Sequence, residues 1–139
     1  MKRILIFSIM FFVSFISTCY AEQLAVIKTS GVVFKDKLKV LAFDDPDIRG
    51  ITCYVTLPSR ALSFTDQTDS AISCRQTGII QGNIVSKSRI FKNKKSIFVK
   101  SLFVDRVYDK KRNVLIYVSY TSKMSGDNAN NSVSVVIIK

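Results

Sequence analysis

Residues 96–121 have the sequence SIFVKSLFVDRVYDKKRNVLIYVSYT, in which two runs rich in Val, Ile, Phe and Tyr flank a polar segment at 109–113. β-Branched and aromatic residues favour strands over helices. A short polar segment between two such runs is typical of a β-hairpin. This stretch therefore predicts two antiparallel strands, at 96–108 and 114–121, joined by a tight loop.

Similar runs lie on both sides of this hairpin. Further strands are predicted at 24–27, 32–34, 37–43, 51–56, 84–91 and 132–138. Several of these runs alternate apolar and polar residues, which is the two-residue period of a strand. Residues 44–47 contain Pro46 between aspartates and have turn chemistry. We therefore expect one mainly β domain, a single antiparallel sheet or a sandwich-like arrangement.

One short helix is predicted at residues 69–78. Asp69 is suited to cap the first turn of a helix, and Gly78 stands where a glycine would end it. This helix would carry Cys74. The expected fold is thus a β domain with one short helix.

Residues 1–21 have the three parts of a secretory signal peptide. Lys2 and Arg3 precede an apolar run at 4–16, and Ala21 ends a short segment suited to cleavage. The apolar run is shorter than the roughly 20 residues that a membrane-spanning helix needs. We therefore expect cleavage after Ala21 and an exported domain at 22–139 without a transmembrane segment. Lipidation of Cys19 is the weaker alternative, because Thr18 fits a lipobox poorly.

Cleavage would leave two cysteines, Cys53 and Cys74, in the exported domain. Disulfides persist outside the reducing cytosol, and an even pair in an exported domain indicates a disulfide. A redox-active pair is the alternative, but such pairs usually have the spacing Cys-x-x-Cys. We expect one structural disulfide between Cys53 and Cys74.

The composition argues against most enzyme classes. Among 139 residues, 47% are hydrophobic and none is His. The apolar fraction is too high for a long disordered chain. The absence of His removes the commonest general base and the commonest metal ligand. We therefore predict no catalytic residues, no cofactor and no metal site.

Three blocks of this sequence resemble one family. They are residues 43–55, residues 69–76, and residues 108–113 followed by Tyr117 and Tyr120. In this order, and over nearly the whole exported domain, they are similar to the CreA family of small exported bacterial proteins. The resemblance implies a periplasmic location and a shared domain, but the family has no established biochemical activity. Residues 58–65 depart from the family's longer glycine-rich stretch, so a ligand role for those glycines does not carry over.

The first of these blocks contains an acidic turn, whose residues are Asp44, Asp45, Pro46 and Asp47. Carboxylate oxygens are ligands for Ca²⁺, but the spacing does not match an EF-hand loop. A structural turn in contact with Arg49 is the simpler hypothesis. The resemblance marks the turn as characteristic of the family and assigns it no role.

The chain is strongly basic, with 21 Lys and Arg against 10 Asp and Glu. Two loops of the predicted meander concentrate these charges, and if they lie at one end they form one anion-binding patch. Its candidate residues are Lys92, Lys94, Lys95, Lys110, Lys111 and Arg112. An exported protein should not meet genomic DNA, so anionic envelope polymers, lipid headgroups or an envelope protein are the expected partners. A solvated basic face is the alternative.

The aromatic residues of the meander indicate packing more than a ligand groove, because aromatics on paired strands usually form core and cross-strand contacts. They are Tyr108, Tyr117 and Tyr120, with Phe98 and Phe103 nearby. The leading function hypothesis is a periplasmic binding or accessory protein with a basic, aromatic-bearing surface. The alternative is a structural assembly subunit that pairs through an edge strand at 132–138. A hydrolase or redox enzyme is less favoured.

Overall fold

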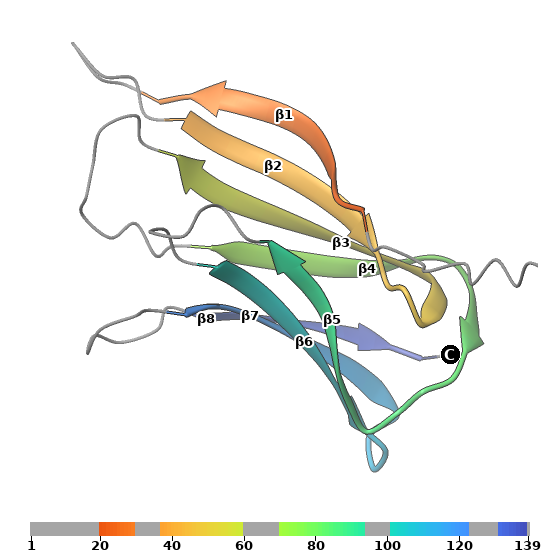
Figure 1. The fold of residues 1–139 in the computed structure, drawn as a ribbon. Coiled ribbons are helices and arrows are strands. Elements are labelled where there is room, and N and C mark those ends of the chain that lie inside the picture. The colour runs from red at the N-terminus through yellow and green to blue at the C-terminus, as the bar shows by residue number, and fades with distance from the viewer. Residues whose placement is uncertain (1–19, 30–36, 60–69, 94–100, 123–130, 139) are drawn as a thin grey trace, which may run out of the picture.

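The structure, a computed structural model, describes residues 20–29, 37–59, 70–93, 101–122 and 131–138. These residues form eight strands in two antiparallel four-stranded sheets, each ordered as in the sequence (Figure 1). The N-terminal sheet contains β1 (Glu22–Lys28), β2 (Lys37–Asp44), β3 (Ile48–Ser59) and β4 (Ala71–Gly82). The C-terminal sheet contains β5 (Lys87–Asn93), β6 (Ser101–Asp109), β7 (Val114–Ser122) and β8 (Asn131–Ile137).

The prediction of a mainly β chain is confirmed, but the strands divide into two sheets and not one. A single sheet of these strands would expose one long apolar face, whereas two sheets bury their apolar faces against each other. The strand predicted at 32–34 lies outside the described residues, as does the beginning of the one at 96–108. Among the described residues, no helix has the length and hydropathy needed to cross a membrane.

The prediction of a helix at 69–78 is wrong for its described part. Residues from Ala71 onward belong to β4, where Ala71 and Ser73 are exposed while Ile72 and Cys74 are buried. This alternation has the period of a strand, and Cys74 pairs directly with Cys53 on β3. Asp69, the expected helix cap, lies outside the described residues. Pairing with β3 therefore overrides the local capping signals.

The core lies between the two sheets. The rings of Phe43 on β2 and Phe91 on β5 stack with centroids 4.4 Å apart, which joins the sheets directly. Buried apolar side chains of both sheets surround this pair, including Leu41, Ile51, Val55, Leu102, Val104, Leu115 and Val136. Several of these strands contribute alternate residues, as expected for sheets with one buried face.

The sheets also meet along one seam, where β4 runs beside β8 (Figure 1). The hydroxyl of Ser134 accepts a hydrogen bond from the amide of Cys74 at 2.8 Å, and that of Ser132 accepts one from Ile72 at 3.4 Å. Serine side chains of β8 thus take the place of a paired strand at the edge of β4. Such bonds satisfy backbone donors that burial would otherwise leave unpaired.

The disulfide between Cys53 and Cys74 is confirmed. The two residues lie directly opposite each other in the β3–β4 ladder and are separated by 21 positions in sequence. Both side chains are buried, Cys53 completely and Cys74 to all but 7%. The bond therefore joins two neighbouring core strands.

The predicted hairpin loop at 109–113 is confirmed between β6 and β7. Asn113 has a positive φ of 53°, a conformation that Asn tolerates better than most residues. The Arg112 guanidinium pairs with the carboxylate of Asp109 at 2.7 Å, and the Tyr108 hydroxyl donates to the Asn113 side chain at 2.9 Å. These local contacts fix the turn at the end of the C-terminal sheet.

Removing the disulfide should lower the free energy of unfolding. A cross-link across a loop of this length stabilises a fold by about 3 kcal/mol, chiefly by restricting the unfolded chain. The double variant Cys53→Ala, Cys74→Ala is therefore expected to unfold at a lower urea concentration than the wild type. Reduced wild-type protein should match it to within about 1 kcal/mol. Equal stability of the oxidised wild type and the double variant would contradict this role.

Candidate functional site

The acidic turn between β2 and β3 is built around the carboxylate of Asp45, a residue that is only 4% exposed. Its Oδ1 accepts hydrogen bonds from the amides of Asp47 at 3.0 Å and Ile48 at 3.1 Å. An aspartate that bonds backbone amides two and three residues ahead stabilises a tight turn. Asp45 therefore stabilises its own turn, independently of its contacts with the other sheet.

The first part of β3, just after this turn, requires glycine. Gly50 has a φ of +83° and lies at an irregularity in the pairing of β3 with β4. A Cβ at this position would come within 2.5 Å of the carbonyl oxygen of Ile79. Because any other residue would both strain the backbone and collide with β4, the turn and the neighbouring strand fit only with Gly50.

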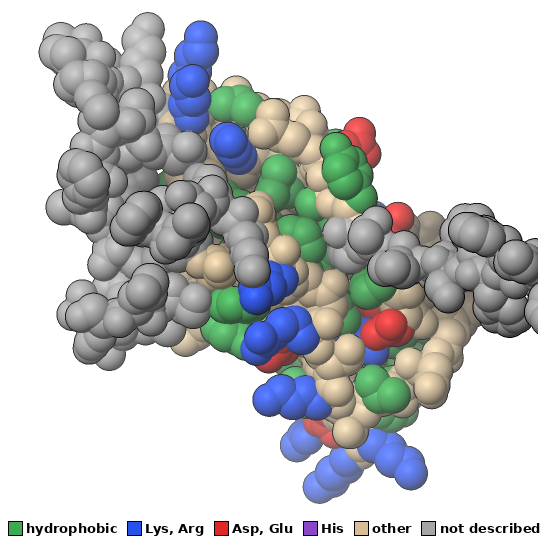
Figure 2. Space-filling view, in the orientation of Figure 1, with side chains coloured by type: hydrophobic (Ala, Val, Ile, Leu, Met, Phe, Trp, Pro, Cys, Tyr) green, Lys and Arg blue, Asp and Glu red, His purple; other side chains and the backbone are tan. Residues whose placement is uncertain are grey.

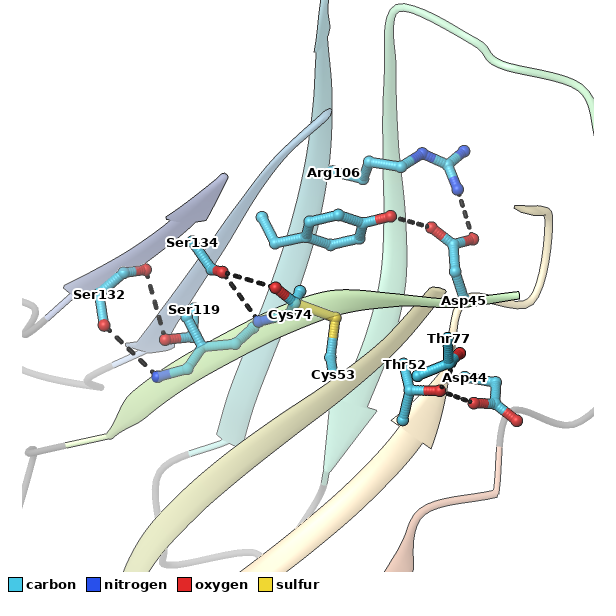
Figure 3. The surroundings of a disulfide bond; sticks show 12 residues. Asp44, Asp45, Thr52, Cys53, Cys74, Thr77, Arg106, Ser119, Ser132 and Ser134 are labelled. Atoms are coloured by element: carbon cyan, nitrogen blue, oxygen red, sulfur yellow. Dashed lines mark hydrogen bonds and ion pairs between the residues drawn. A yellow bond between two sulfur atoms is a disulfide. The ribbon is translucent and has the colours of Figure 1, made fainter. Parts of the chain in front are cut away.

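Asp45 also binds two side chains of the C-terminal sheet (Figure 3). Arg106 on β6 forms an ion pair with its Oδ1, and both side chains are completely buried. The Tyr117 hydroxyl on β7 donates to its Oδ2 at 2.8 Å. A second nitrogen of Arg106 reaches Oδ2 of Asp47 at 3.1 Å. One carboxylate thus joins the β2–β3 turn to two strands of the opposite sheet.

The electrostatics of this cluster favour a charged Arg106 and a neutral Tyr117. Burial and the Asp45 charge raise the pKa of the Tyr117 hydroxyl far above its ordinary value of 10.0. Burial alone would lower the pKa of Arg106, but the hydrogen bond to Asp45 and the charge of that carboxylate outweigh it and raise the pKa. The cluster therefore holds one fixed charge pair and one neutral hydrogen-bond donor.

Arg106 is the residue that sequence reasoning missed. For Asp45 and Asp47 the ion-pair partner is Arg106 and not Arg49, which had been expected to contact the turn. The sequence contains a signal for its burial, because Arg106 continues the alternation of the buried residues Leu102 and Val104 on β6. An arginine on a buried strand face requires a buried carboxylate nearby.

The carboxylates of the turn do not converge on a cation site. Asp44 points away from Asp45 and accepts a hydrogen bond from the Thr52 hydroxyl at 2.6 Å (Figure 3). Within the described ranges no three Cys, Asp or Glu side chains are grouped in a way that could hold a metal ion. Asp45 is instead committed to Arg106 and Tyr117.

A second cluster lies on the outer face of the C-terminal sheet, turned away from the core. The pairing of β5 through β8 sets residues in rows across this face. The three rows are Lys92, Phe103, Tyr120 and Asn131; Arg89, Asp105, Val118 and Val133; and Lys87, Val107, Ile116 and Val135. Cations therefore lie along β5, the aromatic pair Phe103 and Tyr120 lies beside Lys92, and the valines of β8 lie at the far side of the face.

An irregularity in β5 brings the cations to one face. The register shifts between Arg89 and Phe91, so that Ile90 is an extra residue relative to β6. Arg89 is opposite Asp105 and Lys92 is opposite Phe103, although a regular strand would turn residues three apart to opposite faces. The alternation of the sequence could not reveal this arrangement, because the bulge interrupts it.

The outer cluster combines an ion pair with stacking. Arg89 binds Asp105 at 2.9 Å and the Tyr120 hydroxyl at 2.6 Å, and its guanidinium lies 4.5 Å from the centre of the Phe103 ring. Lys92 lies 5.4 Å from the same ring centre. Burial raises the pKa of Asp105, but hydrogen bonds from Arg89 and Tyr120 outweigh it and hold the pKa below its ordinary value. Arg89 is nevertheless half exposed, so the cluster is open to a ligand.

The predicted anion-binding residues do not gather at one end of the sheet. Lys92 is opposite Phe103 near the start of β6, whereas Lys110, Lys111 and Arg112 follow the end of that strand. Lys94 and Lys95 lie outside the described residues. Lys87 and Arg89 lie on β5 between Lys92 and the β6–β7 turn. Basic side chains therefore form a column along β5 toward that turn (Figure 2). The charges therefore form a stripe and not a patch between two loops.

The comparisons with known proteins agree on one family. The family model described as CreA protein matches residues 25–139. The chain belongs to the CreA family. It is 37% identical over 137 residues to Protein CreA of Escherichia coli strain K12, covering 84% of this chain and 83% of the relative. The CreA proteins of E. coli O6:H1 strain CFT073 and E. coli O157:H7 match with the same values. No solved structure matches.

Within this chain, the family block at 43–55 acquires a structural explanation. It supplies the Asp45 carboxylate, the tight turn and Gly50, and it includes Cys53. The block at 108–113 is the turn between β6 and β7. Tyr117 from the following strand completes the buried cluster. Features that carried the resemblance are thus brought together by the contact between the sheets.

The buried Tyr117 predicts a loss of stability in alkali. Folding raises the pKa of its hydroxyl. Its contribution to the free energy of unfolding is therefore complete below the pKa of the unfolded state, about 10, and is lost as the pH rises above that value. Above that pH, the Tyr117 hydroxyl alone should lower the free energy of unfolding by about 1.4 kcal/mol per pH unit. Tyr117→Phe should lack this part of the slope, although it is less stable at neutral pH because Asp45 loses a hydrogen bond.

Urea unfolding between about pH 8 and 11 tests this expectation. The matched control is Tyr54→Phe, which removes a hydroxyl from an exposed side chain on the N-terminal sheet. The control should keep the wild-type slope. Parallel curves for the wild type and Tyr117→Phe would show that the Tyr117 hydroxyl does not govern alkaline stability.

Proposed function

We propose that this CreA-family protein is an exported binding or accessory protein that docks on an anionic surface of the cell envelope. The outer face of the C-terminal sheet is the proposed docking surface. The observation that carries this proposal is the stacking of Arg89 and Lys92 on the Phe103 ring. Cations held by an aromatic ring at a sheet surface are placed for contact with anionic groups while losing little further side-chain freedom.

The other cations of the stripe support this role. Lys87 continues the line of Arg89 and Lys92 along β5, and Lys110, Lys111 and Arg112 extend it beyond the end of β6. Only Asp105 among the residues of the three rows is acidic, and Arg89 pairs with it. Clustered cations raise the local potential and attract anions, with an affinity that falls as salt is added.

The apolar half of the same face favours lipid headgroups over a soluble polymer. Val133, Val135 and Ile137 of β8 are 55%, 54% and 61% exposed. Val133 and Val135 lie on the same face as the cations because their rows run from β5 to β8, and Ile137 follows Val135 by two residues on that face. A surface with cations on one side and aliphatic side chains on the other matches an anionic membrane, which offers both charge and hydrocarbon.

The proposed location is the periplasm, after removal of residues 1–21 as a signal peptide. The Cys53–Cys74 disulfide supports export, because such bonds persist mainly in oxidising compartments. A lipid on Cys19 is the alternative anchor and would hold the domain at a membrane independently of the stripe. We propose no catalytic activity, and the burial of both cysteines favours a structural disulfide over a redox-active one.

Vesicle binding tests the proposed function. Wild-type protein should sediment with phosphatidylglycerol vesicles, weakly or not at all with phosphatidylcholine vesicles, and less in high salt. The double variant Lys87→Glu, Lys92→Glu should lose roughly 30-fold or more in affinity, since each basic residue near an anionic surface contributes about 1 kcal/mol.

The matched control is Arg49→Glu, Arg75→Glu, which changes the net charge equally by reversing two exposed residues of the N-terminal sheet. It should bind nearly as the wild type does. Equal loss in both double variants would mean that net charge alone drives the association. Binding to a soluble polyanion such as polyglutamate, but not to vesicles, would contradict the lipid assignment and favour an envelope polymer.

A further inference from the structure

The side chains around Arg89 occupy one edge of its guanidinium. The Nε hydrogen bonds to Oδ1 of Asp105 at 2.9 Å, and an Nη2 hydrogen bonds to the Tyr120 hydroxyl at 2.6 Å. At the other end of the plane, Nη1 and Nη2 point their remaining hydrogens outward in parallel, and these have no acceptor among the described residues. Because the Arg89 side chain is 52% exposed, a ligand in solution can reach this end.

The outward end of Arg89 has the geometry that recognises a phosphate group. Parallel N–H groups of one guanidinium donate to two oxygens of the same anion, which an ammonium group cannot do. The Phe103 ring lies 4.5 Å from the guanidinium carbon and supports its plane. Lys92, at 5.4 Å from the same ring centre, has no carboxylate partner in the part of the chain that the structure describes. The cluster therefore offers a fork and a point charge to one anionic group.

Asp105 orients this fork. Its carboxylate accepts a hydrogen bond from Arg89 through Oδ1 and one from Tyr120 through Oδ2, the second at 2.9 Å. Only 13% of the Asp105 side chain is exposed, so the carboxylate is turned toward its two donors and not toward a ligand. These bonds hold the guanidinium in place before an anion arrives, and a group that is already ordered loses less entropy on binding.

We propose that this cluster is a specific site for the phosphodiester of an anionic phospholipid headgroup. Arg89 is the bidentate donor, Lys92 is the second cation, and Asp105 is the residue that positions Arg89. The inference rests on the proposed function and adds a defined site to it. A lipid is the favoured source of the phosphodiester because the exposed side chains of Val133 and Val135 lie in rows of the same face.

A site of this kind differs from a basic stripe that acts through charge alone. A stripe attracts anions according to its net charge, so that an arginine and a lysine are equivalent and every acidic residue weakens binding. In the proposed site, Arg89 is not replaceable by lysine, and Asp105 strengthens binding although its charge has the same sign as that of the ligand.

NMR titration with a short-chain phosphatidylglycerol, kept below its micelle concentration, tests the site directly. The amide signals of Phe103 and Tyr120 and the Nε–H signal of Arg89 should shift and saturate together. The amide signal of Arg75, on the N-terminal sheet, should stay in place. No shift at the three cluster residues, or equal shifts over all basic residues, would overturn the site whether or not the protein binds vesicles.

A charge-conserving variant separates the site from net charge in the vesicle assay. Arg89→Lys keeps the charge and loses the fork, so it should weaken binding to phosphatidylglycerol vesicles roughly tenfold. Its matched control is Arg75→Lys, the same change at an exposed arginine of the N-terminal sheet. The control should bind as the wild type does.

The variant Asp105→Asn tests the positioning role, because the two accounts predict opposite signs. It makes the surface more positive, so a stripe that acts through charge alone would bind anionic vesicles more tightly. The proposed site predicts binding weaker by roughly threefold or more, because Arg89 loses its orientation. The control Asp109→Asn removes an acid from the end of the same strand, where it pairs with Arg112, and should bind at least as tightly as the wild type.

The two assays distinguish failure of the site from failure of the proposed function. Vesicle binding by Arg89→Lys or Asp105→Asn that equals or exceeds that of the wild type would overturn the site and leave membrane docking intact. A wild type that ignores vesicles but shows saturable shifts at Arg89 would support the site and contradict membrane docking. Arg89→Lys changes a half-exposed side chain and should fold as the wild type does, and amide spectra away from the cluster check the fold of Asp105→Asn.

Discussion

The arrangement of the two sheets depends on the ion pair between Asp45 and Arg106, whose side chains are completely buried. Taking two charges out of water costs several kcal/mol per ion unless each finds its partner and further hydrogen bonds. Here the carboxylate also accepts bonds from Tyr117 and from two backbone amides of its own turn. The β2–β3 turn must therefore sit over β6 and β7 in one position, because any displacement would leave a buried charge unpaired.

Neighbouring residues of β6 separate the structural site from the proposed binding surface. Arg106 points into the core and pairs with Asp45, whereas Asp105 points outward and pairs with Arg89. The inner pair is closed to solvent and explains why the acidic turn characterises the family block. The outer pair is accessible and holds Arg89 beside the Phe103 ring. One strand thus connects the contact that orders the fold with the surface to which we assign binding.

Features that depend on residues close together in the sequence could be predicted, whereas those that depend on distant residues could not. The described strands other than β4, and the 109–113 turn, could be predicted because alternation and turn chemistry are local. The disulfide followed from the predicted signal peptide and from the even number of cysteines that its removal would leave. The helix at 69–78 was wrong because pairing of Cys74 with Cys53 overrides local capping signals. The Asp45–Arg106 pair joins residues of different sheets, and the bulge at Ile90 breaks the alternation, so neither was found from the sequence.

A double-mutant cycle between Asp45 and Arg106 tests the central claim most directly. The free energies of unfolding of Asp45→Asn, Arg106→Met and the combined variant are measured by urea denaturation. If the pair fixes the sheets together, each single variant leaves one buried group uncompensated, and the combined variant should lose about 2 kcal/mol less than the sum of the two. Additive losses, equal to within about 0.5 kcal/mol, would contradict the account.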